Sequence, residues 1–137
     1  VKFDRDKYFL ATAVLFFFPG VPEIYYGDEI FMDGKQDPFN RKGMKWDSKE
    51  FESEDHKLFK EILNLYKTKI LKKGDVKFYS KNNVAYIERE FKKSKYVLAF
   101  YKGDKPCKCN LKNVILSRNF NNNSFKKTGF AILNSKK

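Results

Sequence analysis

The feature that most constrains this chain is the apolar run at residues 8–18, which ends at Pro19 and Gly20. The run is apolar on almost every side of a helix, so a helix over about residues 4–18 has to be buried on most of its surface. Proline and glycine end that helix. Residues 23–26 follow between turn residues, which is typical of a short strand buried on both faces. A buried helix followed by a buried strand predicts part of a parallel α/β unit.

The rest of the chain divides near Gly74, where the hydrophobic period changes. A second helix is predicted at residues 55–71, because apolar side chains recur there at three- and four-residue steps. After Gly74 the chain alternates in short runs separated by Lys-, Asn- and Gly-containing turns, which predicts a small antiparallel sheet or sandwich of about five to seven strands. We expect residues 74–137 to form an all-β domain able to fold alone. Residues 1–73 offer one strand and two helices, too few for a covered sheet. Either this strand joins others outside the chain or it packs on the β domain, and the first alternative is favoured because this half looks cut from a larger α/β fold.

Composition excludes some functional classes. The net charge is +12, but only four of the 29 basic residues are arginines. Phosphate-reading surfaces favour arginine, so we expect a solvated lysine-rich surface and no nucleic-acid partner; a basic nucleic-acid-binding β domain remains a minor alternative. No apolar run reaches the ~20 residues of a membrane-spanning helix, so no membrane contact is expected. Cys107 and Cys109 are expected to be reduced thiols, which favours a cytoplasmic location and leaves secretion open. His56 is the only histidine, and we interpret it as a solvated surface residue; neither a metal site nor a cofactor is predicted.

The loop after the predicted strand carries the charged candidates. Asp28 and Glu29 are sequence neighbours and point apart on a strand, so they do not meet the ~5 Å spacing of a retaining glycosidase pair. We expect both to hold loops by hydrogen bonds. Asp37 and Arg41 lie four residues apart around Pro38. They can pair with each other, or both can face a cleft and bind sugar hydroxyls, and the spacing does not decide between these alternatives.

The segment GVPEIYYGDEIFMDGKQDPFNRKGMKW, residues 20–46, resembles the region around the last barrel strand of the α-amylase superfamily of glycoside hydrolases. The pattern from Asp33 to Arg41 is most similar to the neopullulanase, cyclomaltodextrinase and maltogenic amylase branch. The resemblance extends through a helix like the eighth barrel helix to a C-terminal β domain whose final strand resembles residues 129–133. It implies an α+β fragment: the last strand and flanking helices of a (β/α)₈ TIM barrel at residues 1–73, then a small antiparallel β-sandwich at residues 74–137.

The resemblance also implies a function and a division of roles. The parent would be a retaining hydrolase of α-1,4 or α-1,6 glucosidic bonds in maltooligosaccharides, cyclodextrins or pullulan. Its catalytic carboxylates would precede this chain, so the fragment alone is expected to be inactive and to partner the remainder of the barrel. Asp37 and Arg41 would bind the α-glucan substrate. Tyr26, Asp28, Glu29 and Trp46 match family positions and are expected to be structural or to lie behind the sugar-binding side chains.

A different class of function remains open on the sequence alone. The chain could be a free-standing, non-catalytic carbohydrate-binding or structural module. In that case an apolar helix without a barrel would leave its surface exposed, which predicts aggregation or dimerisation. The sequence does not fix the oligomeric state.

Overall fold

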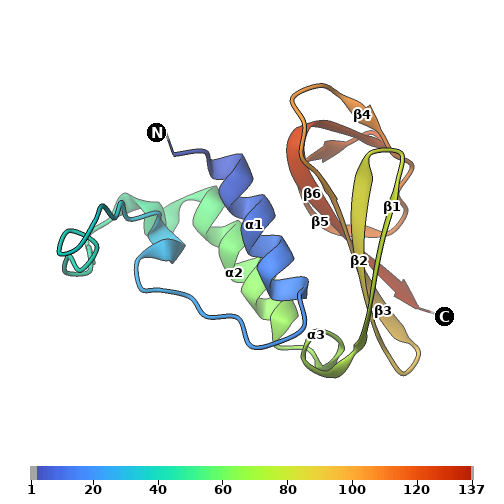
Figure 1. The fold of residues 1–137 in the computed structure, drawn as a ribbon, viewed down its shortest axis with the longest axis horizontal. Coiled ribbons are helices and arrows are strands. Elements are labelled where there is room, and N and C mark those ends of the chain that lie inside the picture. The colour runs from blue at the N-terminus through green and yellow to red at the C-terminus, as the bar shows by residue number, and fades with distance from the viewer. Residues whose placement is uncertain (1–2, 137) are drawn as a thin grey trace.

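A computed structural model describes residues 3–136 and shows a helical layer packed against one antiparallel sheet (Figure 1). The helices all precede the strands in the chain. They are α1 (Arg5–Phe17), the 3-10 helices η1 (Asp28–Ile30) and η2 (Lys49–Glu52), α2 (Glu54–Tyr66) and α3 (Lys69–Lys73). The strands are β1 (Asp75–Lys81), β2 (Val84–Phe91), β3 (Ser94–Tyr101), β4 (Cys107–Lys108), β5 (Val114–Asn121) and β6 (Ser124–Lys136).

Helix α1 begins and ends where its sequence predicts. The Asp4 side chain accepts hydrogen bonds from the backbone N–H groups of Asp6 and Lys7, which caps the amino end. Phe18 leaves the helical conformation directly before Pro19. Burial is less complete than the apolar composition predicts, because Leu15 remains 45% exposed and Phe18 52% exposed. One face of α1 packs on the sheet, and the opposite face lies at the surface.

The strand predicted at residues 23–26 is not formed in the part of the chain that the structure describes. These residues run between Gly20 and the η1 turn without a ladder partner. A strand exists only when a neighbour satisfies its backbone groups, and the described sheet lies on the far side of α1 (Figure 1).

The helix predicted as one unit at residues 55–71 is divided, so this prediction is wrong at its carboxyl end. Ser53 caps α2 by accepting from the His56 N–H, and the helix ends at Tyr66. Thr68 adopts an extended conformation, and its hydroxyl donates to the Leu65 carbonyl at 2.7 Å. This hydrogen bond competes with helix continuation, as hydroxyl side chains do elsewhere, and the short helix α3 follows.

The sheet has six antiparallel strands, within the predicted range. Its order is β1-β2-β3-β6-β4. Strand β5 lies off this path and also pairs with β6. Two of its hairpins close through asparagine pairs at positive φ: Asn82-Asn83 joins β1 to β2, and Asn122-Asn123 joins β5 to β6. Asparagine tolerates this conformation better than most residues, which is why the Asn-containing turns were readable from the sequence.

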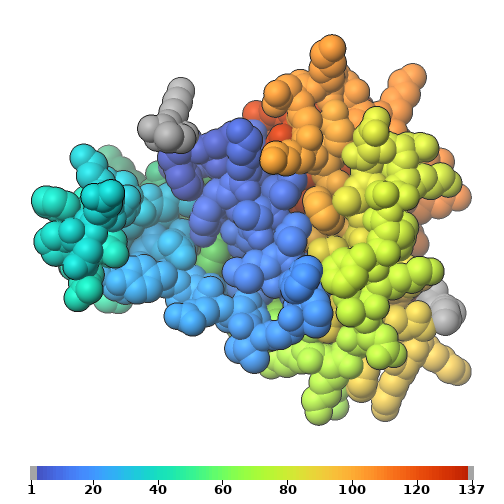
Figure 2. Space-filling model, in the orientation of Figure 1, coloured from blue at the N-terminus to red at the C-terminus, as the bar shows by residue number. Residues whose placement is uncertain are grey.

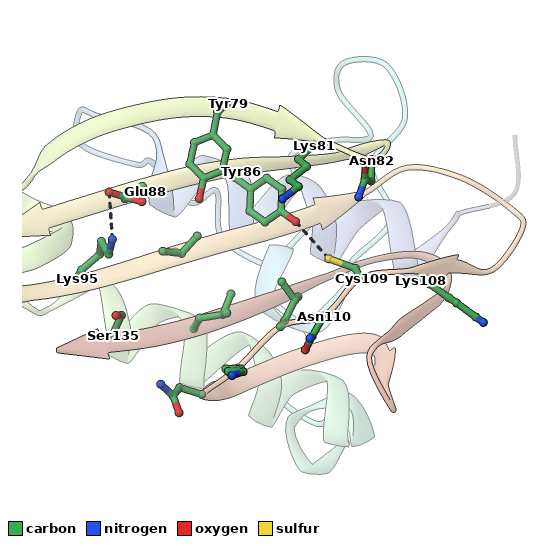
Figure 3. A pocket seen from close by; sticks show the side chains of 15 residues that line it. Tyr79, Lys81, Asn82, Tyr86, Glu88, Lys95, Lys108, Cys109, Asn110 and Ser135 are labelled. Atoms are coloured by element: carbon green, nitrogen blue, oxygen red, sulfur yellow. Dashed lines mark hydrogen bonds and ion pairs between the residues drawn. The ribbon is translucent and has the colours of Figure 1, made fainter. Parts of the chain in front are cut away.

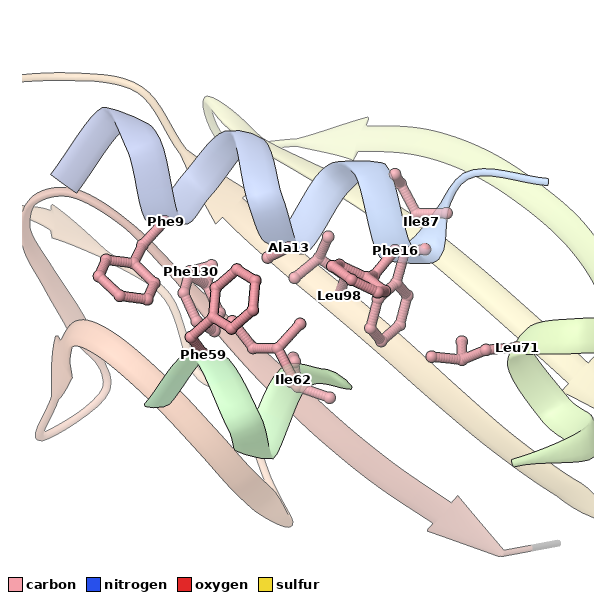
Figure 4. Packing of buried hydrophobic residues seen from close by; sticks show 11 residues of the cluster. Phe9, Ala13, Phe16, Phe59, Ile62, Leu71, Ile87, Leu98 and Phe130 are labelled. Carbon is pink, nitrogen blue, oxygen red and sulfur yellow. The ribbon is translucent and has the colours of Figure 1, made fainter. Parts of the chain in front are cut away.

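The two faces of the sheet bury different side chains. On the helical side, Ile87, Leu98, Phe130 and Ile132 join residues of the three helices in one apolar cluster (Figure 4). On the other side a smaller cluster forms around Val84, Ala99, Phe125 and Ala131. The helical contributors to the first cluster are Phe9, Ala13, Phe16, Phe17, Phe59, Ile62 and Leu71. The helices and the sheet therefore share one core.

A buried arginine joins the end of α1 to the start of the sheet. Arg89 on β2 is 2% exposed. Its Nη1 donates to the Phe17 carbonyl at 2.9 Å, and its Nη2 donates to the Gly74 carbonyl at 2.9 Å. The positive charge thus lies at the carboxyl end of α1, where the helix dipole favours a cation.

Ion pairs hold the other end of α1 against the sheet. Arg118 on β5 donates to Asp6 and to Asp55, each at 2.7 Å, and Arg5 donates to Asp55 at 2.8 Å. Burial alone would raise the pKa of both aspartates. Hydrogen bonds outweigh this effect of burial: Asp55 accepts from Arg5 and Arg118, and Asp6 accepts from Lys127 and Arg118. Both pKa values therefore lie below their usual range.

Candidate functional site

The predicted site lies in the segment that links α1 to α2, and its base is a tight turn at residues 27–31. Gly27 has φ +90°, and a side chain there would collide with Met32. The Glu29 carboxylate accepts from the Gly27 N–H at 2.8 Å, and the Asp28 carboxylate accepts from the Tyr25 N–H at 3.3 Å. Asp28 and Glu29 thus bind the backbone of their own turn.

Both long helices hold this turn in place. The Tyr8 hydroxyl on α1 donates to the Asp28 carbonyl at 3.0 Å. On α2, the His56 Nδ1–H donates to the Glu29 carbonyl at 2.8 Å. Burial raises the pKa of Asp28, partly opposed by the Tyr25 N–H and reinforced by the Glu29 carboxylate.

The interpretation of His56 as a solvated histidine is wrong. Its side chain is 8% exposed, and its ring lies edge-on to Phe51 with centroids 5.4 Å apart. The polar residues that flank it suggested an exposed helix start, but the ring turns inward to reach a carbonyl of the Gly27–Phe31 turn. Its neighbours on α2 carry no signal for that partner, which lies 27 residues earlier in the chain.

Asp37 and Arg41 lie in the loop that projects from the helical layer, drawn in cyan in Figure 1. Arg41 Nε is 2.8 Å from Asp37 Oδ1, so the two side chains form an ion pair. The pair is solvent-accessible, with side chains 71% and 60% exposed. An exposed pair of this kind contributes little to stability, about 0–1 kcal/mol, and both groups retain free donors and acceptors for a ligand.

Aromatic side chains surround the same loop and are unusually exposed. Trp46 is 79% exposed and Phe39 is 59% exposed. The rings of Tyr25 and Tyr26 lie 4.6 Å apart, and the Tyr26 hydroxyl donates to the Lys42 carbonyl at 2.7 Å. Tyr26 therefore connects the start of the loop to Lys42 near its end. The Trp46 ring stays accessible to a ligand.

The described residues contain no group of three or more His, Cys, Asp or Glu side chains placed to hold a metal ion. Cys107 and Cys109 are both free thiols. None of the helices at residues 3–136 is both long and apolar enough to cross a membrane. The space-filling view shows the loop as a lobe that stands apart from the sheet (Figure 2).

Known proteins resemble this chain in sequence over part of their length. A cyclomaltodextrinase from a Bacillus species is 36% identical over 94 residues, which cover 64% of this chain and 17% of the relative. Amylopullulanase of Thermoanaerobacterium saccharolyticum is 33% identical over 90 residues, covering 64% of this chain and 7% of the relative. Neopullulanase 2 of Thermoactinomyces vulgaris is 36% identical over 75 residues, covering 54% and 13%. No protein-family model matches the chain.

The fold gives a fuller match. Maltogenic amylase from S. marinus superposes with a TM-score of 0.82 and 28% identity, over 98% of this chain and 20% of that chain. The chain belongs to the α-amylase family. The resemblance inferred from the sequence is thereby confirmed.

The α-amylase family relationship also accounts for the sheet, which matches the C-terminal domain of that family. A cyclic α-maltosyl-(1→6)-maltose hydrolase from Arthrobacter globiformis shares this fold, with a TM-score of 0.72 at 18% identity over 96% of this chain and 31% of its own. The chain spans one fifth or less of the curated relatives named above.

Proposed function

We propose that this chain is the C-terminal part of a retaining α-glucan hydrolase, in which it supplies one sugar-binding loop and the β domain. In this proposal residues 1–73 complete a (β/α)₈ barrel and residues 74–137 form the C-terminal domain. The catalytic carboxylates belong to the rest of the barrel, so the chain alone does not cleave glucans. The observation that carries the proposal is the match to maltogenic amylase over 98% of this chain.

Exposed apolar side chains on α1 and just after it support the proposal that a barrel packs against this layer. Leu15 and Phe18 are about half exposed, and Val21 is 91% exposed. An apolar hollow beside them is lined by α1, by residues 23–24 and by Phe59 of α2. Residues 21–24 belong to no helix or strand of the described chain, so a neighbouring strand could pair with them and cover the hollow at the same time.

The exposed ion pair supports the sugar-binding role of the loop. Asp37 and Arg41 hold each other in place at 2.8 Å while their remaining oxygen and nitrogen atoms face solvent. A carboxylate accepts from sugar hydroxyls and a guanidinium donates to them, so the pair can bind one glucose unit through both kinds of hydrogen bond. The loop would contribute by positioning the substrate, since the bond chemistry lies elsewhere.

The test uses a protein that contains this chain together with the preceding barrel. We expect Arg41→Ala and Asp37→Ala each to lower kcat/KM on maltooligosaccharides by about tenfold or more, the equivalent of one charge-assisted hydrogen bond. The melting temperature should change little, because the pair is exposed. Lys57→Ala is the matched control, since it removes another exposed ion pair, the one with Glu54 on α2, which lies outside the loop.

If both loop variants lower the melting temperature and leave kcat/KM unchanged, the Asp37–Arg41 pair is only a structural clasp and the loop does not bind sugar.

A further inference from the structure

A second groove lies on the face of the sheet that points away from the helices (Figure 3). It has a volume of about 550 Å³, within the range of about 300–1,000 Å³ that small-molecule sites occupy. Strands β1, β2, β3 and β6 form one side of it, and residues 108–113 form the other. The groove is separate from the Asp37–Arg41 loop, and none of its lining residues belongs to residues 1–73.

Two tyrosines form an aromatic wall of this groove. Tyr79 on β1 and Tyr86 on β2 face each other across the strand pair, and their rings stack with centroids 4.8 Å apart and planes 7° apart. The Tyr86 hydroxyl lies 3.2 Å from the Cys109 sulfur, which ties the wall to the opposite side of the groove. Tyr79 remains 38% exposed. The wall is therefore fixed before any ligand arrives, which lowers the entropic cost of binding.

The remaining lining combines apolar and neutral polar groups. Val97 and Leu133 lie on the sheet face, and Leu111 lies in the opposite segment. The side-chain amides of Asn110 and Asn113 also line the groove, and neither makes a hydrogen bond to the described residues 3–136. Amides offer both donors and acceptors, which is what a hydroxyl group of a ligand requires.

The charged lining consists of four lysines (Lys81, Lys95, Lys108 and Lys112) and one carboxylate, that of Glu88, so the choice of a sugar rests on the stacked rings and the amides. Lysines are present, but no arginine lines the groove, although arginine is the usual partner of phosphate. The Glu88 carboxylate lines the groove and forms an ion pair with Lys95, with Oε1 3.4 Å from Nζ. This carboxylate can also accept a hydrogen bond from a sugar hydroxyl. Burial, and then the Glu88 charge, raises the pKa of Tyr79, so its hydroxyl stays neutral near pH 7.

We propose that this groove is a second, non-catalytic binding site for an α-linked glucan chain. The Tyr79–Tyr86 wall offers an apolar surface to the sugar rings, and Asn110 and Asn113 bind their hydroxyl groups. The choice of an α-glucan rests on the proposed function, because that function supplies a polymer long enough to contact the barrel and the β domain together. Such a site would hold the polymer near the enzyme and raise its local concentration.

The experiment titrates the 137-residue chain with maltohexaose and records amide chemical shifts by NMR. We expect saturable shifts around residues 79, 86 and 108–113. Tyr79→Ala should raise Kd by about three- to tenfold, the loss of one aromatic contact. Phe78→Ala is the matched control, because this neighbour on β1 is similar in size and exposure but packs on Phe18 on the helical face. It should leave Kd unchanged.

Other outcomes would overturn the inference. The absence of shifts with millimolar maltohexaose, or an equal effect of the two variants, would contradict it. Tighter binding of a single-stranded oligothymidine, falling steeply with salt, would assign the groove to nucleic acid instead. If Arg41→Ala abolishes maltohexaose binding and Tyr79→Ala does not, the sugar binds at the loop. In none of these cases does the proposed function fail, because that is decided by kcat/KM in the longer protein.

Discussion

Replacement of the buried Arg89 by methionine tests whether this side chain fixes the helical layer to the sheet. The change keeps an unbranched side chain of similar length and removes every donor. Two carbonyl oxygens, those of Phe17 and Gly74, would lose the hydrogen bonds that Arg89 makes to them at 2.9 Å. The hydrogen bond to the Phe17 carbonyl is buried, and the one to the Gly74 carbonyl is partly buried.

The expected loss follows from these contacts. A buried acceptor left without its donor costs about 1–3 kcal/mol, and the partly buried Gly74 carbonyl costs less than the Phe17 carbonyl, so the two together cost about 2–5 kcal/mol. Part of this is offset, because methionine has no charge to bury; burial already lowers the pKa of Arg89. We therefore expect Arg89→Met to reduce the free energy of unfolding by about 3 kcal/mol.

The assay is urea unfolding followed by circular dichroism at pH 7. Arg41→Met provides the control, since it makes the same chemical change at a side chain that is 71% exposed, and it should cost less than about 0.5 kcal/mol. A lower midpoint with an unchanged m-value would show lost stability of the native fold. If the two variants unfold at the same urea concentration, Arg89 does not connect the layers as described.

Two further predictions concern stability. At Gly129 a methyl group would overlap the Arg118 carbonyl oxygen, so Gly129→Ala should lower the free energy of unfolding in urea by about 1–3 kcal/mol. Gly43→Ala is the control and should cost far less, because no atom lies within 4 Å of the added methyl group. Equal effects of the two variants would contradict this packing. Asp6 and Asp55 have lowered pKa values in the folded protein, so their contribution is full above the unfolded pKa near 4 and is lost as pH falls through the folded values. Unfolding measured from pH 7 to pH 2 should show this loss, and Asp55→Asn should flatten it; an unchanged slope in Asp55→Asn would refute the assignment.

The features that the sequence predicts well are local ones. Helix α1 is bounded by Asp4 and Pro19, each of which acts within one turn of the helix end. The hairpin turns at Asn82-Asn83 and Asn122-Asn123 depend on the conformational preference of asparagine itself. The spacing of Asp37 and Arg41 left pairing and sugar binding open, and the structure shows the pair.

The features that the sequence misses depend on distant partners. The inward turn of His56 depends on a carbonyl 27 residues away, and the role of Arg118 depends on Asp6, 112 residues earlier. The predicted strand at residues 23–26 shows the reverse case, because its sequence suits a strand but the described chain offers it no neighbour. The groove on the outer face of the sheet is assembled from five strands and the segment after β4, so no single stretch of sequence carries its pattern.

The apolar cluster shared by the helices and the sheet restricts how this region can be exchanged between relatives. A chimera joined at Gly74 would place a foreign helical surface on Ile87, Leu98, Phe130 and Ile132, which are 0–2% exposed here. Volume mismatches in such a seam cost about 1–3 kcal/mol each. A chimera that keeps its stability must therefore take α1 and α2 from the same parent as the strands. The segment that can be exchanged between relatives is larger than the β domain.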